Sequence, residues 1–237
     1  MSAAHTISRD TSRITPAIED YLKAIYQLGR EEPDAGVVTG QRIAERLGVA
    51  APSVTNMVKR LRELELVRHE PYGGVELTET GEQIALEVVR HHRLLERYLV
   101  EALGYGWDEV HDEAERLEHH LSDRLEARLD SLLGFPATDP HGDPIPRQGS
   151  DLALDPTLLQ TPAGAEGRVS RVSDRDPAQL RYLRALGIVP GARVTVLEHL
   201  PFEGPVRVRV LAGEGEPGAE HEHVLGRTLA QAVRLAS

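Results

Sequence analysis

The stretch from residue 92 to residue 120, HRLLERYLVEALGYGWDEVHDEAERLEHH, constrains the chain most, because its imidazoles and carboxylates recur at helical spacing. The glycines at 104 and 106 predict a turn between two helices. On the first helix, His92 and Glu96 lie one turn apart. The matching residues of the second helix are His111, Glu115, Glu118 and His119. Their i, i+4, i+7 and i+8 spacing puts them on one helix face, so the two helices can share a metal ion.

The absence of cysteine limits the chemistry of such a site. None of the 237 residues is a cysteine, which excludes disulfides, thiolate zinc sites, haem attachment and iron–sulfur ligation. Nitrogen and oxygen ligands suit Mn(II) and Fe(II), although imidazole also accepts zinc, cobalt and nickel. Residues 81–140 carry 14 acidic and 6 basic side chains, a balance of −8 within a net charge of −11. A bound cation would offset part of that charge, and a solvated acidic helix face is the alternative.

The pattern of residues 1–78 predicts a winged helix-turn-helix DNA-binding domain. A helix begins at Thr15-Pro16, and a short helix then runs from its cap at Thr39 to Gly48. Pro52 opens a second amphipathic helix, and a Pro-Tyr-Gly-Gly turn between two short strands forms the wing. The candidate DNA contacts are Thr39, Gln41, Arg42, Pro52, Ser53, Thr55, Asn56, Lys59, Arg60 and Tyr72.

The polar residues of the second helix favour DNA as the partner of this domain. Ser53, Thr55 and Asn56 offer hydroxyl and amide groups that can reach base edges in a major groove. Lys59 and Arg60, one turn later, suit phosphates. A winged helix that makes only protein contacts is the alternative, and DNA binding is the commoner use.

The rest of the chain predicts a helical domain, a linker and a small β domain, so the fold is mainly α. Residues 79–140 contain two long helices, one to about residue 102 and one from about 107 to 133, whose apolar faces suit a symmetric dimer. Residues 141–164 are a Pro/Gly/Asp-rich linker, and residues 165–237 alternate like the strands of a small β-barrel. No run approaches the ~18 apolar residues of a membrane span. Without a secretory segment at the N-terminus, we expect a cytoplasmic protein with no membrane partner.

Several stretches together resemble one family, the metal-dependent repressors of the diphtheria toxin repressor type with their manganese-responsive branch. They are TPAIEDYLKAIYQL, RIAERLGVAAPSVTNMVKRL, RHHRLLERYL, VHDEAERLEHHLSD and DPHGDPIP. The resemblance covers residues 14–237 and implies that the C-terminal unit is the family's SH3-like (FeoA-like) domain. It also implies a homodimeric regulator of manganese or iron uptake genes, bound to palindromic operator DNA when metal is present.

The resemblance further implies two sites per subunit for Mn(II) or Fe(II). The implied primary site consists of Asp20, Glu115, Glu118 and His119. The implied ancillary site consists of His92, Glu96 and His111, completed from the SH3-like domain by Asp176 and Gln179. Asp20 and Glu115 replace the methionine and cysteine of the iron-type members, as in the manganese branch. Lys23 departs from that branch, which has a second carboxylate at this position.

A non-heme metalloenzyme and a metal-buffer protein are the alternatives from other classes. A ferritin-like enzyme needs Glu-x-x-His pairs on four long helices, whereas this chain predicts two long helices. A metal buffer would leave the winged helix unexplained, so we expect a regulator and not an enzyme. His120 is turned by about 100° from His119 on a helix and is not a predicted ligand. His221 and His223 are interpreted as an exposed loop pair, for which a peripheral metal site is the less favoured role.

Overall fold

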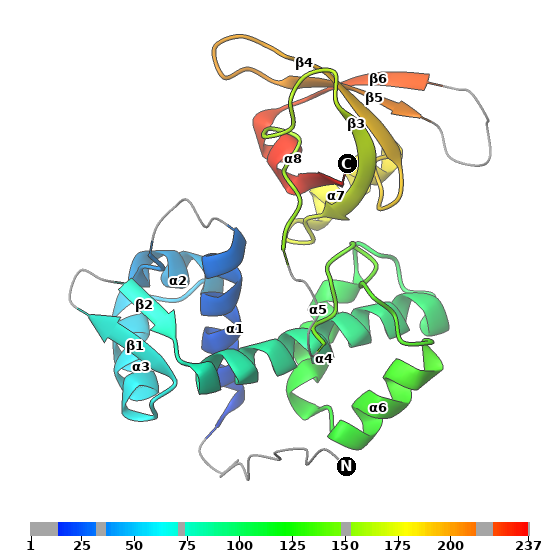
Figure 1. Ribbon diagram of the computed structural model, residues 1–237. Helices are drawn as coiled ribbons and strands as arrows, with labels where there is room; N and C mark the ends of the chain where they lie inside the picture. Colours follow the sequence, from blue (N-terminus) through cyan, green and yellow to red (C-terminus); the bar gives the residue numbers. More distant parts are fainter. Residues whose placement is uncertain (1–13, 32–36, 71–73, 148–152, 212–219, 237) are drawn as a thin grey trace, which may run out of the picture. The chain divides into compact units, whose positions relative to one another are not determined.

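The structure is a computed structural model that describes residues 14–31, 37–70, 74–147, 153–211 and 220–236 (Figure 1). The chain divides into two compact units, Met1–Val89 and Arg90–Ser237. Each unit has its own apolar core. Among the described residues, no helix is long and apolar enough to cross a membrane.

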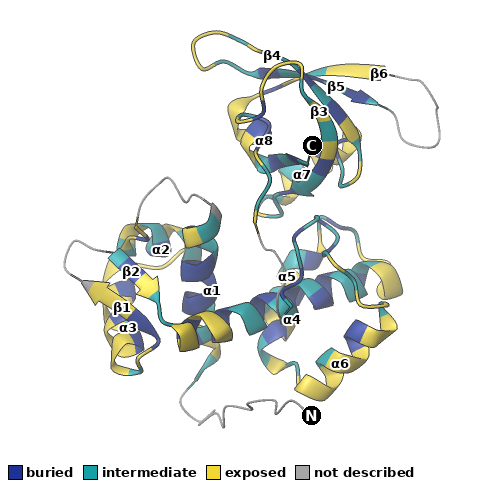
Figure 2. Cartoon of the chain, in the orientation of Figure 1, coloured by how far each residue is buried: buried dark blue, intermediate teal, exposed yellow. Residues whose placement is uncertain are grey.

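The first unit contains the winged helix-turn-helix expected from the sequence. Its elements are α1 (Pro16–Glu31), α2 (Gly40–Leu47), α3 (Ala51–Glu63), β1 (Val67–Glu70), β2 (Gly74–Leu77) and the start of α4 (Glu79–Leu103). Thr39 caps α2 by accepting a hydrogen bond from the Arg42 backbone N–H at 3.3 Å, and Gly48 ends the helix with φ 64°. Ile18, Ile43 and Leu61 meet in the core, so the polar face of α3 stays exposed (Figure 2).

In the second unit, the segment from about residue 107 to residue 133 is not one continuous helix. The prediction of a single long helix there was wrong. The segment forms α5 (Val110–Leu117), a 3₁₀ turn (Glu118–His120) and α6 (Asp123–Leu132). Ser122 caps α6 by accepting a hydrogen bond from the Leu125 backbone N–H at 3.3 Å. A serine followed by an aspartate is a helix-start signal, so the sequence itself marks the beginning of α6 at this position.

Residues 137–147, here called the strap, follow α6 and lead toward the β domain, and Asp139, His141 and Asp143 within the strap are buried. Asp139 Oδ1 accepts hydrogen bonds from the backbone N–H groups of His141 at 2.8 Å and Asp143 at 2.9 Å. The strap lies directly against a strand of the β domain, because the Val172 backbone N–H donates to the His141 carbonyl at 2.9 Å. Gly142, at φ 92°, permits this approach, since a Cβ there would lie 1.9 Å from the Ser170 carbonyl oxygen.

The C-terminal part of the second unit is a curved five-stranded antiparallel sheet, in the order β6-β5-β4-β3-β7 (Figure 1). The strands are β3 (Glu166–Val172), β4 (Arg193–His199), β5 (Val206–Leu211), β6 (Glu220–Leu225) and β7 (Val233–Ala236), with the helices α7 (Pro177–Ala185) and α8 (Arg227–Ala232). The expected SH3-like architecture is confirmed. Trp107, from the segment between α4 and α5, packs into the core of this domain. Trp107 therefore gives the helical part an apolar contact with the β domain.

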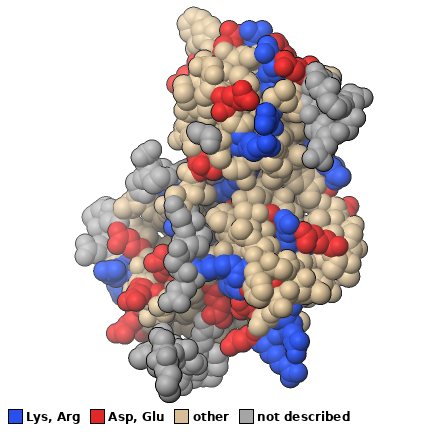
Figure 3. Space-filling view, turned by 45° about the vertical axis from the view of Figure 1, so that its right-hand side comes forward, with Lys and Arg blue, Asp and Glu red and all other residues tan. Residues whose placement is uncertain are grey.

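The outer surface of the β domain, at the top of Figure 3, carries interspersed basic and acidic patches. Neighbouring strands of this domain are linked by ion pairs from Arg207 to Glu198 at 3.0 Å and from Arg209 to Glu222 at 2.8 Å. His221 and His223 lie on the edge strand β6, so their interpretation as loop residues was wrong. Their rings stack at 6.4 Å between centroids. Among the described residues, no third metal-ligating side chain forms a group with these two histidines.

Candidate metal centre

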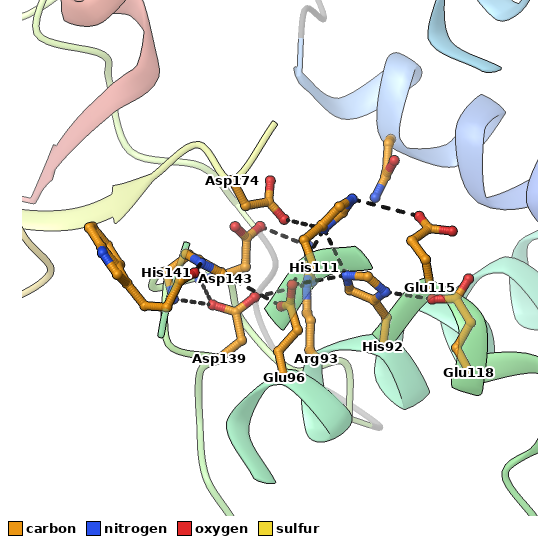
Figure 4. A network of polar contacts seen from close by, with 12 residues as sticks. His92, Arg93, Glu96, His111, Glu115, Glu118, Asp139, His141, Asp143 and Asp174 are labelled. Atoms are coloured by element: carbon orange, nitrogen blue, oxygen red, sulfur yellow. Dashed lines mark hydrogen bonds and ion pairs between the residues drawn. The ribbon is translucent and has the colours of Figure 1, made fainter. Parts of the chain in front are cut away.

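Glu96 lies at the centre of a buried group of imidazoles in the second unit (Figure 4). Its Oε1 lies 3.0 Å from His92 Nε2 and 3.4 Å from His111 Nδ1, and its Oε2 lies 3.7 Å from His141 Nδ1. Asp174, which follows β3, brings its Oδ2 to 3.3 Å from His111 Nδ1. These five residues, here called the inner cluster, join α4, α5, the strap and the β domain.

The hydrogen bonds around His141 suit a metal ligand. The ring Nε2–H donates to the Trp107 carbonyl at 2.6 Å, so in the neutral ring the Nδ1 lone pair faces Glu96. A histidine that donates one ring N–H to a carbonyl is typically oriented to coordinate metal through the other nitrogen. Among the described residues, neither His141 Nδ1 nor Glu96 Oε2 has a hydrogen-bond partner, although both atoms are buried. Their 3.7 Å separation is close to the roughly 3 to 3.5 Å expected between two ligands of one ion.

The charges of the inner cluster depend on each other. Burial alone lowers the pKa of His111, but the carboxylates of Asp174 and Glu96 outweigh it and raise that pKa to about 10. Burial likewise lowers the pKa of His141, and Glu96 is the main group that raises it to about 10. Burial raises the pKa of Glu96, yet His92, His111 and His141 hold it well below its usual range. Without metal, protons on the imidazoles therefore balance the carboxylates, and a divalent cation can take their place.

Glu115, Glu118 and His119, here called the turn ligands, lie where α5 passes into the 3₁₀ turn. Glu118 is fully buried, and its Oε2 lies 2.5 Å from His92 Nδ1. His119 Nε2 lies 3.5 Å from Glu118 Oε1, and Glu115 Oε1 lies 3.8 Å from His111 Nε2. The ligand atoms of His92, Glu115 and Glu118 lie within 4.8 Å of one another. His92 consequently faces both groups of ligands.

The fourth predicted primary ligand, Asp20, lies on α1 in the first unit, so its meeting with the turn ligands stays a prediction. The candidate DNA contacts lie in the first unit too, and those of α3 from Pro52 to Arg60 are exposed. Thr39 caps α2, whereas the Arg42 side chain donates to the Leu28 carbonyl at 3.5 Å. Tyr72 lies outside the described residues. Direct contact of these side chains with DNA also stays a prediction.

The β domain places Asp174 in the inner cluster, while the predicted donors Asp176 and Gln179 make other contacts. Asp176 caps α7, accepting from the Ala178 backbone N–H at 2.8 Å and from the Gln179 side-chain amide at 3.1 Å. Their role as ligands stays a prediction. Sequence reasoning assigned no role to Asp174 or His141. The DPHGDPIP segment contained the missed signal, since its charged residues and histidine alternate within a Pro/Gly-rich stretch.

Comparison with known proteins identifies three successive regions. Residues 13–75 match the family described as iron dependent repressor, N-terminal DNA binding domain. Residues 78–147 match the iron dependent repressor metal binding and dimerisation domain, which here includes the strap. Residues 157–236 match the FeoA domain.

Individual relatives agree with these matches. The iron-dependent repressor IdeR of Mycobacterium tuberculosis is 37% identical over 239 residues, covering 94% of this chain and 98% of that protein. The diphtheria toxin repressor of Corynebacterium diphtheriae is 40% identical over 128 residues, covering 54% and 55%. Among solved structures, a manganese-dependent transcriptional repressor in complex with manganese has a TM-score of 0.81 at 42% identity, covering 93% of this chain and 99% of that one. ScaR with bound Cd²⁺ has a TM-score of 0.77 at 34% identity, covering 93% and 99%.

Proposed function

The chain belongs to the iron-dependent repressor family of metal-dependent, DNA-binding transcriptional regulators, and we propose that Mn(II) or Fe(II) activates it to repress metal-uptake genes. It is a regulator and not an enzyme, as its relatives are repressors. The observation that carries the choice of ion is the inner cluster, whose donors are all nitrogen and oxygen. Such donors fit Mn(II) and Fe(II), and the absence of sulfur from the set favours the harder Mn(II).

We infer two metal sites per subunit with different partners. The inner cluster would hold one ion through His92, Glu96, His111 and Asp174, whose ligand atoms lie within 4.8 Å of one another, with His141 beside it. The turn ligands would hold the second ion together with Asp20 of α1. A bound divalent cation supplies positive charge that offsets the carboxylates, while the protein supplies the fixed positions of the donors.

Metal control of DNA binding follows from the positions of these donors in the sequence. Asp20 lies on α1 of the DNA-binding unit, whereas Glu115, Glu118 and His119 lie in the other unit. An ion held by both would restrict the spacing of the recognition helices in the dimer. Without the ion, the carboxylates repel each other and the two units sample arrangements that fit DNA less well. The difference in metal affinity between these states sets the size of the switch.

A symmetric dimer and a palindromic operator complete the proposal. The matched dimerisation domain supports the dimer, and α6 exposes large apolar side chains that suit a partner surface. Much of the surface of α6 is exposed (Figure 2). Leu125 and Leu132 are 48% and 68% exposed, and Phe135 just after the helix is 64% exposed. Two recognition helices related by a two-fold axis would read half-sites about 34 Å apart.

The test is DNA binding by the full chain as a function of metal. A duplex selected from a random pool by the Mn(II)-loaded protein serves as the probe. Fluorescence anisotropy with Mn(II), Fe(II), Zn(II) or a chelator should show binding with the first two ions and little binding in chelator. The selected sequences should be palindromic. Equal affinity in chelator would eliminate the metal switch, and selected sites without symmetry would eliminate the palindromic operator.

A further inference from the structure

His91 is a buried histidine that belongs to neither group of metal ligands. It lies on α4 next to the cluster residue His92, and only 6% of its surface is exposed. Its ring reaches the turn between α5 and α6, where Nδ1 lies 3.1 Å from the Glu118 carbonyl oxygen. Its Nε2 lies 3.1 Å from Glu126 Oε2, on the first turn of α6. One imidazole therefore connects the end of α5 to the beginning of α6.

The Glu118 carbonyl needs such a donor because of its place in the chain. Carbonyl groups at a helix end lack the N–H partner that a continuing helix would provide. Here α5 ends at Leu117, and the backbone passes through the 3₁₀ turn before Ser122 caps α6. A carbonyl oxygen only accepts hydrogen bonds, so the His91 Nδ1–H is the donor. Losing that donor would remove a buried contact that restrains the Glu118 peptide.

The other partner of His91 is itself held in place. Glu126 is ion-paired with Arg90, and its hydrogen bond with His91 is the main cause of its lowered pKa. Arg90 also donates to Asp130 Oδ2 at 2.8 Å, and Arg147 of the strap holds both oxygens of Asp130 at 2.8 and 2.6 Å. A continuous series of ion pairs and hydrogen bonds thus fixes the ring of His91 in one orientation.

We propose that His91 is a positioning residue that sets the metal affinity of the turn ligands by holding the Glu118 backbone, without touching the ion. The inference rests on the proposed function, in which Glu118 and His119 bind metal. Glu118 and His119 are consecutive residues of one short turn, so a rotation of the peptide between them moves both donors at once. Groups that orient ligands in this way typically change metal affinity by roughly 10- to 100-fold when removed.

Two amide variants separate the two hydrogen bonds of His91. In His91→Asn, the side-chain amide lies near the position of Nδ1 and can still donate to the Glu118 carbonyl. In His91→Gln, the longer side chain carries its amide to the position of Nε2 and can still contact Glu126. His91→Leu removes both contacts, and Glu126→Gln serves as the control that changes the Nε2 partner and the Arg90 ion pair but keeps the Nδ1 contact.

The experiment measures the two metal sites of the full chain separately. Mn(II) titrations followed by electron paramagnetic resonance count the bound ions, and His119→Ala identifies the site that contains the turn ligands. Fluorescence of Trp107, the single tryptophan, reports the inner cluster because His141 stacks on its ring at 5.6 Å between centroids. Thermal melting in chelator checks that each variant is folded.

We expect His91→Leu and His91→Gln to weaken Mn(II) at the turn-ligand site by roughly 10- to 100-fold, with His91→Asn and Glu126→Gln within about 3-fold of the parent. The inner cluster should keep its affinity in all four. Equal affinities of the Asn and Gln variants, or parallel losses at both sites, would overturn the role of His91. If the parent chain itself has no site that His119→Ala removes, the proposed primary site fails instead.

Discussion

The inner cluster and the turn ligands use the same kinds of donor but differ in burial and in origin. In the inner cluster, Glu96 and His141 are fully buried, and the donors come from four segments of one unit. Among the turn ligands, the Glu115 side chain is 41% exposed, and the whole set comes from five consecutive positions. The fourth ligand predicted for the turn set, Asp20, belongs to the other unit.

This difference separates a site that one unit can build by itself from a site that depends on two. In the inner cluster, imidazoles and carboxylates already balance each other's charge, so an ion there would mainly join the strap and the β domain to α4. A site that needs both units is filled only when they are suitably arranged, which is the requirement for a switch. The inner cluster is therefore expected to be structural, and the turn ligands are expected to sense the metal.

The largest expected effect is the loss of metal-activated DNA binding in Asp20→Ala. In the proposed primary site, the Asp20 carboxylate is the ligand that ties the DNA-binding unit to the ion. Without this carboxylate, affinity for the selected duplex in Mn(II) should fall at least about 100-fold. Anisotropy titrations measure this fall. Glu19→Ala is the matched control, since it removes a neighbouring carboxylate of the same helix.

The two sites would not be independent if Asp20→Ala lost the Trp107 signal for the inner cluster together with DNA binding. That outcome would mean that the two sites fill as one. Unchanged dimerisation by analytical ultracentrifugation is also expected, because the exposed apolar residues of α6 lie far from Asp20 in the sequence.

A smaller effect should decide which carboxylate of the β domain completes the inner cluster. Asp174 contacts His111, whereas Asp176 caps α7 and accepts from the Ala178 backbone N–H. Asp174→Asn should weaken Mn(II) at the inner cluster by roughly 10- to 100-fold, with little change at the turn ligands. The paired variant Asp176→Asn should leave both metal affinities near those of the parent. If Asp176→Asn weakened Mn(II) at the inner cluster more than Asp174→Asn did, as measured by Trp107 fluorescence, the ligand would be Asp176.

Helical periodicity explains which part of the site could be predicted from sequence. His92 and Glu96 are one turn apart on α4, and His111 lies on α5, so a regular backbone fixes their relative directions. His141 and Asp174 come from irregular segments, where spacing in the sequence carries no direction. Only the packing of the strap against β3 brings them to Glu96.

The errors in the predicted secondary structure have similar local causes. The break between α5 and α6 was missed because the spacing from His111 to His119 fits one continuous helix, although Ser122 provides a helix cap. The strand β6 was missed because its polar and charged residues hide the alternation expected of a half-buried strand. The winged helix and the strands β3 to β5 were predicted correctly, since caps, turns and alternating valines agree there.

The affinity of the inner cluster for metal should depend on pH. The pKa values of His111 and His141 are raised to about 10, above the ordinary value of 6.5. Their protonated forms stabilise the metal-free fold fully below pH 6.5, and this contribution is lost as the pH rises through about 10. A metal ion must displace these protons, so Mn(II) affinity should rise with pH, by up to about 10-fold per unit for each proton released.

Anaerobic Mn(II) titrations at pH 6.5, 7.5 and 8.5, followed by Trp107 fluorescence, measure this slope. Proton release into a weakly buffered indicator dye gives an independent count. In Asp174→Asn, the carboxylate that raises the pKa of His111 is gone, so fewer protons should be released at neutral pH. An affinity that stays flat over these two units would contradict the protonated cluster.

The smallest effect concerns the strap, which holds His141 in the cluster. Gly142→Ala should destabilise the metal-free protein by at least about 2 kcal/mol, because its Cβ would lie 1.9 Å from the Ser170 carbonyl and its φ is 92°. Gly164→Ala, at φ 85° with no atom within 4 Å of its Cβ, carries the backbone strain alone, about 1 kcal/mol. Urea denaturation measures both destabilisations, and their difference isolates the contact between the strap and β3.

Only Gly142→Ala should also weaken Mn(II) at the inner cluster, since only this change moves His141 away from Glu96. Equal losses in the two variants would mean that the strap can shift without cost, and that the inner cluster is less rigid than its burial implies.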